Sequence, residues 1–150
     1  MASINWAYLF NGFHGRIGRQ TFWIAMGVVY VANFFACLIA DHIQGDRLSA
    51  IVDLAFTYPE FAIAIKRAHD RNLPVWVLIA FFTANAVFDL LDVLGWSVTT
   101  NELDMISLAV TVPFAVFAVA LLVELGFRRG TVGPNQYGAD PLAKIQNDAR

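Results

Sequence analysis

Five polar side chains with helical spacing fall inside otherwise apolar parts of the chain. Asp53 and Glu60 are seven residues apart, and Asn85, Asp89 and Asp92 follow an i, i+4, i+7 pattern, so each set shares one helical face. Ionisable residues are expensive in a bilayer, where by default they indicate a functional site. Carboxylates that lie close together share protons. The pattern therefore indicates an ion or proton site at these five residues.

A simpler interpretation of the same acids is structural. Asp53 would pair with Arg47, and Asp92 would reach the polar edge of its segment, because side chains near such an edge extend out of it at little cost. Other chemistry has less support. The three histidines lie in separate connections and Cys37 is the single cysteine, so we expect no disulfide, metal site, cofactor or catalytic residue.

The elements that carry these residues are four long apolar stretches, residues 22–40, 48–65, 75–94 and 105–127. Hydrophobic residues make up 58% of the chain and charged residues 15%, whereas soluble domains have roughly 45–50% and about 25%. At about 1.5 Å per residue, each stretch can cross a hydrocarbon core about 30 Å thick. The sequence predicts an all-α integral membrane four-helix bundle, a single domain over residues 1–150.

The distribution of lysine and arginine predicts the orientation of this bundle. Of the ten basic residues, Arg47 alone lies in the first or third connection between the stretches. Because connections rich in Lys and Arg stay in the cytoplasm, we expect both termini there. Residues 128–150 would form a cytoplasmic tail, and residues 1–21, which carry many aromatic side chains, a short interfacial segment.

Three groups of residues resemble the motifs of a known family. The first is Phe13-His14-Gly15-Arg16 with Arg19 and Phe22-Trp23, similar to F-x-G-R-x-x-R-x-x-[FY]-W. The second is Lys66-Arg67-Ala68-His69-Asp70-Arg71-Asn72 with Trp76, similar to R-R-L-H-D-R/T-G-x-S-G-W-W. The third is residues 133–141, GPNQYGADP, similar to G-x-N-x-Y-G-x-D-P. The chain thus resembles the bacterial inner-membrane family catalogued as domain of unknown function 805, which includes YhaH- and YhaI-like proteins.

The second motif departs from the family pattern in three places. Lys66 stands at the first arginine, Asn72-Leu73-Pro74 stands where the family has Gly-x-Ser-Gly, and Val77 replaces the second tryptophan. The resemblance implies a small protein with several spans in the bacterial cytoplasmic membrane. It implies no particular activity.

All three motifs lie on the predicted cytoplasmic side, so we expect them to meet. Arg16 and Arg19 would hydrogen-bond to Asp70 and to carbonyls at helix ends, because bonds between charged groups are stronger than neutral ones. Tyr137 and Asp140 would close the same network. The predicted structural network is Arg16, Arg19, Arg67, His69, Asp70, Arg71, Tyr137 and Asp140.

These expectations favour a small non-catalytic membrane protein, a scaffold or accessory subunit of a larger membrane assembly. Gly27, Ala32 and Ala36 would offer a partner helix a surface of small residues. The alternative is an oligomeric transporter or ion-conducting protein that uses the acidic residues, and a third possibility is a lipid enzyme using His69 or Asp70. Expected partners are membrane lipids, including anionic headgroups at the cytoplasmic face, and either a protein partner or further copies of the chain. A net charge of −2 indicates no nucleic acid.

Overall fold

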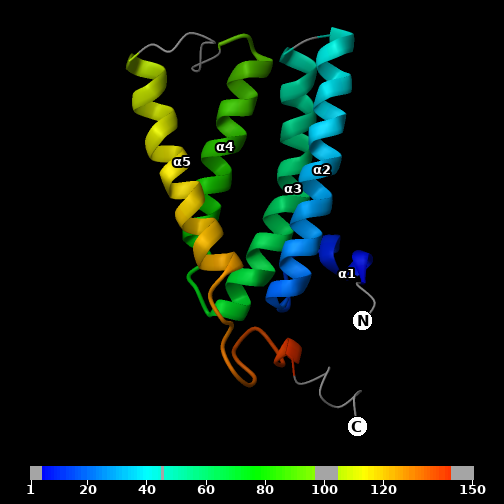
Figure 1. The fold of residues 1–150 in the computed structure, drawn as a ribbon, viewed down its shortest axis with the longest axis vertical. Coiled ribbons are helices and arrows are strands. Elements are labelled where there is room, and N and C mark those ends of the chain that lie inside the picture. The colour runs from blue at the N-terminus through cyan, green and yellow to red at the C-terminus, as the bar shows by residue number, and fades with distance from the viewer. Residues whose placement is uncertain (1–4, 45, 97–104, 143–150) are drawn as a thin grey trace.

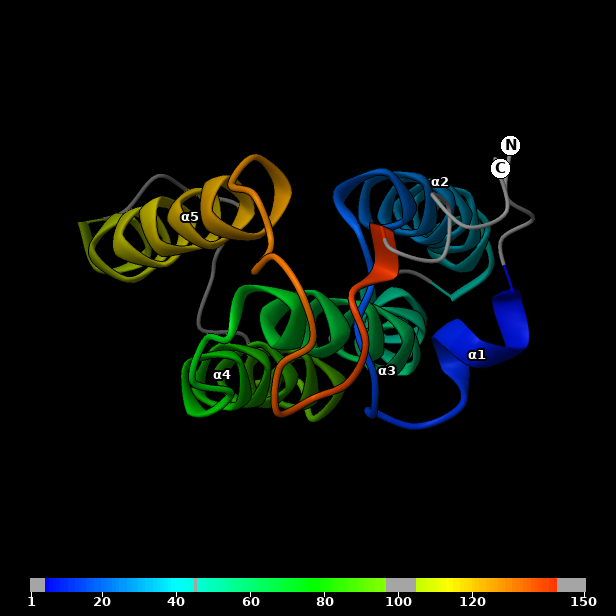
Figure 2. The same ribbon diagram turned by 90° about the horizontal axis from the view of Figure 1, so that it is seen from below.

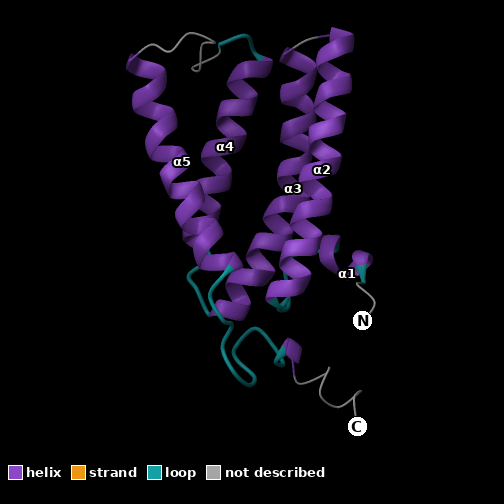
Figure 3. Ribbon diagram, in the orientation of Figure 1, coloured by secondary structure: helices purple, strands orange, loops and turns teal. Residues whose placement is uncertain are grey.

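The computed structural model describes residues 5–44, 46–96 and 105–142. Within these ranges the chain is helical and has no strand (Figure 3). An isolated bridge joins Asn135 to Gly138. The helices are α1 (Trp6–Phe10), α2 (Arg19–Gln44), α3 (Asp46–Arg71), α4 (Trp76–Val93) and α5 (Met105–Gly126).

The prediction of an all-α chain with four long apolar helices is confirmed. The helices α2 to α5 are each long and apolar enough to cross a membrane. Both α2 and α3 have 26 residues, which corresponds to about 39 Å. They continue beyond the predicted ranges 22–40 and 48–65. The added residues are mostly polar, and hydrophobic patterning does not detect such helix ends.

Helix α3 lies at the centre of the fold. Its main neighbours are α2 and α4, and it also contacts α1 and α5. Figures 1 and 2 show α5 leaning away from α2 along its length. Stacked rings of Phe81 and Phe114, with centroids 4.7 Å apart, join α4 to α5. Only 6% of the residues in the apolar part of α5 are buried, so most of this helix faces outward.

One end of the bundle holds most of its charged residues, and we call it the charged end. Helix α1, the α3–α4 connection and residues 127–142 all lie there (Figure 1). The core is concentrated at the same end, where Leu9, Phe22, Ile63 and Leu125 are buried together. Residues 62–70 of α3 are all buried. This part of α3 is therefore surrounded on every side, and the polar side chains in it must find partners inside the protein.

The predicted surface of small residues is only partly present on α2. Gly27 and Ala32 are exposed, but Ala36 is half-buried. At 100° per residue, Ala36 lies on the opposite side of the helix from Gly27. The three residues therefore do not form a single outward face.

Candidate functional site

Asp70 is the centre of a polar network at the charged end. Its side chain is nearly inaccessible, and its Oδ1 accepts hydrogen bonds from Arg16 Nε and Nη2 at 3.2 and 3.0 Å. Its Oδ2 accepts a hydrogen bond from Arg67. A Cβ at Gly130 would overlap Oδ2, so the carboxylate fits only against a residue without a side chain. The predicted bond between Arg16 and Asp70 is present, and two buried arginines share this one carboxylate.

Arg16 also joins the first motif to the third. Its Nη1 donates to the carbonyls of Gly133 and Gly138 at 2.7 and 3.1 Å, and its Nη2 donates to the carbonyl of Thr131 at 2.7 Å. Thr131 is in turn tied to Asp70, because its backbone N–H donates to the carbonyl of Asp70 at 2.8 Å. The segment after α5 therefore folds back around a guanidinium that comes from the other end of the sequence.

Asp140 shapes the loop that receives Arg16. Its carboxylate accepts hydrogen bonds from the backbone N–H groups of Leu142 and Gly133, each at 2.9 Å. These two N–H groups lower the pKa of Asp140, because they stabilise the ionised form. Asp140 therefore acts on Arg16 through the loop: it positions Gly133, whose carbonyl Arg16 contacts.

Side chains from α2 and α3 cover the last carbonyls of α5 and the first carbonyls after it. The carbonyls at the end of a helix have no partner within it. Here five successive carbonyls, those of residues 125–129, each accept a hydrogen bond from a side chain. Arg67 serves two of them, with Nε 2.6 Å from the oxygen of residue 125 and Nη2 2.5 Å from that of residue 128. We call the four donors the α5 clasp: Arg19, Trp23, Arg67 and Arg71.

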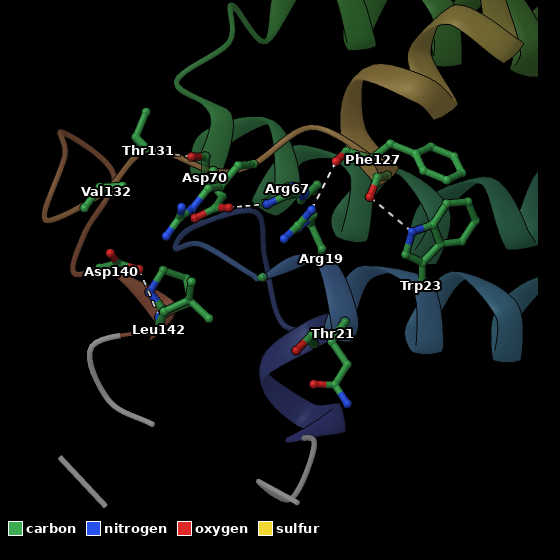
Figure 4. Close-up of a pocket in the computed structure, with 16 residues that line it drawn as sticks. Arg19, Thr21, Trp23, Arg67, Asp70, Phe127, Thr131, Val132, Asp140 and Leu142 are labelled. Atoms are coloured by element: carbon green, nitrogen blue, oxygen red, sulfur yellow. Dashed lines mark hydrogen bonds and ion pairs between the residues drawn. The ribbon is translucent and has the colours of Figure 1, made fainter. Parts of the chain in front are cut away.

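The prediction that Arg19 contacts Asp70 is wrong, whereas its predicted contact with a helix-end carbonyl is present. Arg19 Nη1 donates to the carbonyl of Phe127 at 3.2 Å. Arg16 and Arg67 already occupy the carboxylate of Asp70, and Arg19 begins α2 beside the end of α5 (Figure 4). Trp23 lies on the same side and donates to the carbonyl of Gly126 at 3.1 Å. Positive groups at the carboxyl end of a helix also complement its dipole.

A second carboxylate, Glu124, supports the clasp. Arg71 Nη2 lies 2.6 Å from Glu124 Oε1, and Arg128 Nη1 lies 2.9 Å from Oε2. Both ion pairs are partly exposed, so each contributes little by itself. The pair with Arg71 joins the end of α5 to α3 at the point where the clasp holds its carbonyls, and the pair with Arg128 lies within the end of α5 and the segment that follows it.

His69 and Tyr137 join the second motif to the third by stacking. Their rings are 3.8 Å apart between centroids and almost parallel, at 10°. His69 Nδ1 lies 3.1 Å from the carbonyl oxygen of Gly15. Within the described ranges no hydrogen bond joins the side chains of His69 and Asp70, which differs from the pairing of a catalytic base with an orienting carboxylate. His69 instead connects the N-terminal segment, α3 and residues 127–142.

Lys66 is a network member that the sequence-based prediction left out. It is fully buried, and its Nζ donates to the carbonyls of Leu9, at 2.8 Å, and Gly12. The N-terminal segment is therefore anchored into the charged end. The signal was present in the sequence, because Lys66 occupies an arginine position of the second motif and so keeps a positive charge there.

The turn after α3 has a left-handed residue, Asn72, at the position where the family motif has glycine. Asn72 has φ 56°, the left-handed conformation that glycine adopts readily and asparagine tolerates. The N–H of Leu73 bonds to the carbonyl of Ala68 at 3.0 Å, and the N–H of Asn72 bonds to that of His69 at 3.1 Å. This is the Schellman pattern that ends many helices. Asparagine at position 72 therefore allows the backbone conformation that a glycine there would also allow.

The acids of the predicted ion or proton site take separate hydrogen-bond partners, Asp53 from α2 and Asp89 from within α4. Asp53 Oδ1 accepts hydrogen bonds from Asn33 Nδ2 at 2.9 Å and from Cys37 Sγ at 3.2 Å, both on α2. Asn85 Nδ2 donates to Asp89 Oδ2 at 3.2 Å within α4. Asn33 was not predicted as a partner of Asp53, because a single amide in an apolar helix has no distinguishing pattern.

The other acids of that set have no ion pair in the described part of the chain. Glu60 and Asp92 are half-buried. The predicted pair between Asp53 and Arg47 is wrong, since the ion pairs of residues 5–44, 46–96 and 105–142 involve only Asp70 and Glu124 as acids. In the same ranges no three His, Cys, Asp or Glu side chains could hold a metal ion.

The fold and the network together define a class of protein. It is a small helical protein with four potential membrane spans. At one end of the bundle, buried arginines donate hydrogen bonds to a buried carboxylate and to carbonyls at the end of a helix. The chain belongs to the family described as protein of unknown function DUF805, which matches residues 10–139. This match spans nearly all of the three motifs, and the resemblance predicted from them is confirmed.

Two relatives in Escherichia coli are similar over most of the chain. Both are named "Uncharacterized protein YiiR", one from strain K12 and one from O157:H7. Each is 32% identical over 147 residues, covering 89% of this chain and 87% of the relative. No solved structure matches the chain significantly.

Proposed function

We propose that the protein lies in the bacterial cytoplasmic membrane with its charged end in the cytoplasm. The support is the distribution of basic residues. Arg16, Arg67 and Arg129 lie at the charged end, and Arg47 lies at the start of α3, at the opposite end of that helix. The positive-inside rule favours this orientation. A C-terminal fluorescent-protein fusion should be bright and a C-terminal alkaline-phosphatase fusion inactive. The reverse result would contradict the orientation.

Within that membrane we propose a non-catalytic role as a scaffold or accessory subunit that packs against another membrane protein. The observation that carries this proposal is the outward surface of α2. Gly27 is exposed, and no atom lies within 4 Å of the position that a Gly27 Cβ would take. Val31 and Phe34, which border it on the same helical side, are 58% and 60% exposed. A glycine among large apolar side chains lets a second helix approach closely.

The first test is native mass spectrometry of the tagged protein, extracted gently from its own membrane. A stoichiometric second protein is the expected result. Gly27→Leu should remove that partner, because the new side chain occupies the space the partner helix would need. Val28→Leu is the matched control, since Val28 is exposed on a neighbouring side of the same helix. Equal retention of the partner by wild type and Gly27→Leu would contradict this use of α2.

The alternative function, an oligomeric transporter or ion-conducting protein, is supported by one observation. Asp53, Glu60 and Asp89 lie in apolar helices without an ion pair among the described residues. Such acids indicate ion or proton pathways. Under this alternative, native mass spectrometry should give a homo-oligomer, and Asp89→Asn should abolish ion flux in proteoliposomes. Asp41→Asn is the control, because Asp41 is an exposed carboxylate at the end of α2. An absence of flux in the wild type would refute this alternative.

A further inference from the structure

A cavity of about 940 Å³ lies at the charged end between α2 and the segment that follows α5. Figure 4 shows this cavity, with Arg19, Arg67 and Asp70 on one side and Asp140 and Leu142 across from them. The wall also includes Trp23, Phe127 and Val132, which are 40%, 62% and 79% exposed. The cavity therefore combines guanidinium groups with apolar side chains at the border of the apolar helices.

The arginines that line this cavity differ in how their charge is compensated. At the charged end, Arg16 and Arg67 pair with Asp70. Arg71 and Arg128 pair with Glu124. The described ion pairs include neither of the other two arginines at this end, Arg19 and Arg129, and both of these line the cavity. Two exposed arginines thus line a single space, and neither forms an ion pair among the described residues.

Arg19 has donors beyond those the protein uses in the described ranges. A guanidinium has five N–H donors, and Arg19 spends one of them on the carbonyl of Phe127. The first turn of α2 borders the same space through Gly18, Gln20 and Thr21. The first N–H groups of a helix have no partner within it and favour an anion. These donors supplement the two arginines.

Asp140 lies in the cavity wall, and its negative charge would repel a bound anion. Both of its oxygens are engaged by backbone N–H groups, those of Gly133 and Leu142. Asp70, the other acid of the wall, is shared by two buried arginines. Neither carboxylate forms an ion pair with Arg19 or Arg129 in the described structure, although the charge of Arg129 helps to lower the pKa of Asp140.

We propose that this cavity binds a phosphate ester anion between Arg19 and Arg129. Arginine is suited to phosphate because its planar group donates two parallel hydrogen bonds to the oxygens. The exposed apolar wall at Trp23 and Phe127 favours a lipid as the source, with the phosphate against the arginines and the glycerol and acyl chains along the apolar helices. This inference does not depend on the accessory-subunit proposal, since it concerns the isolated chain.

The test measures lipid retention on purified protein by native mass spectrometry. The probes are dioleoyl-phosphatidylglycerol and dioleoylglycerol, which have the same acyl chains with and without a phosphate. We expect the phosphate lipid to be retained and dioleoylglycerol to be lost. Arg129→Gln should weaken retention about tenfold, the value of one hydrogen bond to a charged group. Arg19→Gln with Arg129→Gln should weaken it further.

Arg128→Gln is the matched control, because it removes the same charge from the neighbouring position but does not line the cavity. Arg129→Gln also leaves the α5 clasp intact, since the clasp uses only the backbone carbonyl of Arg129. Equal effects of Arg128→Gln and Arg129→Gln would overturn the proposal, because they would mean diffuse attraction to surface charge. Equal retention of the two lipids would overturn it as well.

Competition with soluble phosphates distinguishes the source of the ligand. Glycerol phosphate and inorganic phosphate are added at millimolar concentration to the protein with phosphatidylglycerol bound. Continued retention of the lipid supports a membrane lipid as the ligand. Displacement that Arg129→Gln weakens supports the same anion site with a soluble phosphate ester as its ligand.

Discussion

Replacing Asp70 by asparagine tests whether the charged end depends on one buried carboxylate. Asp70 is 4% exposed, and both of its oxygens accept hydrogen bonds from guanidinium groups, Arg16 at Oδ1 and Arg67 at Oδ2. Asparagine keeps the size of the side chain and one acceptor oxygen. It removes the negative charge and turns an NH₂ group toward one of the two arginines. The substitution therefore leaves two buried cations facing a neutral group.

The size of the effect follows from the burial of these charges. Removing one partner of a buried ion pair costs about 3–5 kcal/mol, because the remaining charge is left uncompensated. Since the asparagine side chain would still offer one carbonyl oxygen, we expect the lower value, about 3 kcal/mol. For a chain of this length each kcal/mol lowers Tm by about 2–4 °C, so the expected loss is about 6–12 °C.

The assay is thermal unfolding of the detergent-solubilised protein, followed by tryptophan fluorescence and far-UV circular dichroism. Asp41→Asn is the control, because it removes an exposed carboxylate and should change stability by at most about 0.5 kcal/mol. Arg16→Gln combined with Asp70→Asn should cost less than the two single losses added together, because contacting residues are coupled. If Asp70→Asn unfolds within about 2 °C of the wild type, the network around Asp70 does not stabilise the fold.

Three further predictions concern the backbone around this network. Gly130→Ala should destabilise the protein by about 1–3 kcal/mol, since its Cβ would meet the carboxylate of Asp70. Gly27→Ala is the comparison in the same unfolding assay. Its Cβ would meet no other side chain within 4 Å, so it should stabilise the protein by about 0.5–1 kcal/mol. Asn72→Val should cost about 1–2 kcal/mol at φ 56° and Asn72→Gly almost nothing; equal melting temperatures would refute the role of this turn. The pKa of Asp140 is lowered, so its stabilisation of the loop is present above the ordinary carboxyl pKa and is lost as the pH falls through the lower folded value. In NMR spectra the chemical shift of the Gly133 amide proton should change with pH below 3.8. Asp140→Asn should abolish that change.

The helices were predictable because their apolar residues dominate the composition. Uncharged runs such as residues 22–40 locate a helix by hydropathy alone. The ends of α2 and α3 were not predictable in the same way. Residues 66–71 are polar except for Ala68, and they remain helical because the N-terminal segment, α5 and the final loop bury residues 66–70. Tertiary contacts decide those ends, and hydropathy contains no information about them.

Most residues of the polar network could be predicted from the sequence, but only some of the contacts between them could. Arg16 contacts Asp70, and Tyr137 stacks on His69, so the three motifs come together as their common position outside the apolar stretches suggested. Which acceptor each arginine takes depends on geometry that spacing does not encode. Most acceptors are backbone carbonyls of α5 and its following loop, which have the same chemistry at every position of a sequence. A side chain can be recognised in a motif, but the carbonyl that it binds cannot.

The α5 clasp has a consequence for synthesis on the ribosome. Arg67 and the carbonyl of Leu125 are 58 residues apart in the chain, and Arg71 and the carbonyl of Arg129 are separated by the same number. At about 5–20 residues per second, the ribosome adds each acceptor about 3–12 s after the arginine that donates to it. A chain that ends before α5 lacks the carbonyls that these two guanidinium groups contact, although Arg67 keeps its contact with Asp70. We infer that the clasp distinguishes a finished chain from a truncated one, and that pulse-labelled chains stopped before residue 125 should be degraded faster than full-length chains.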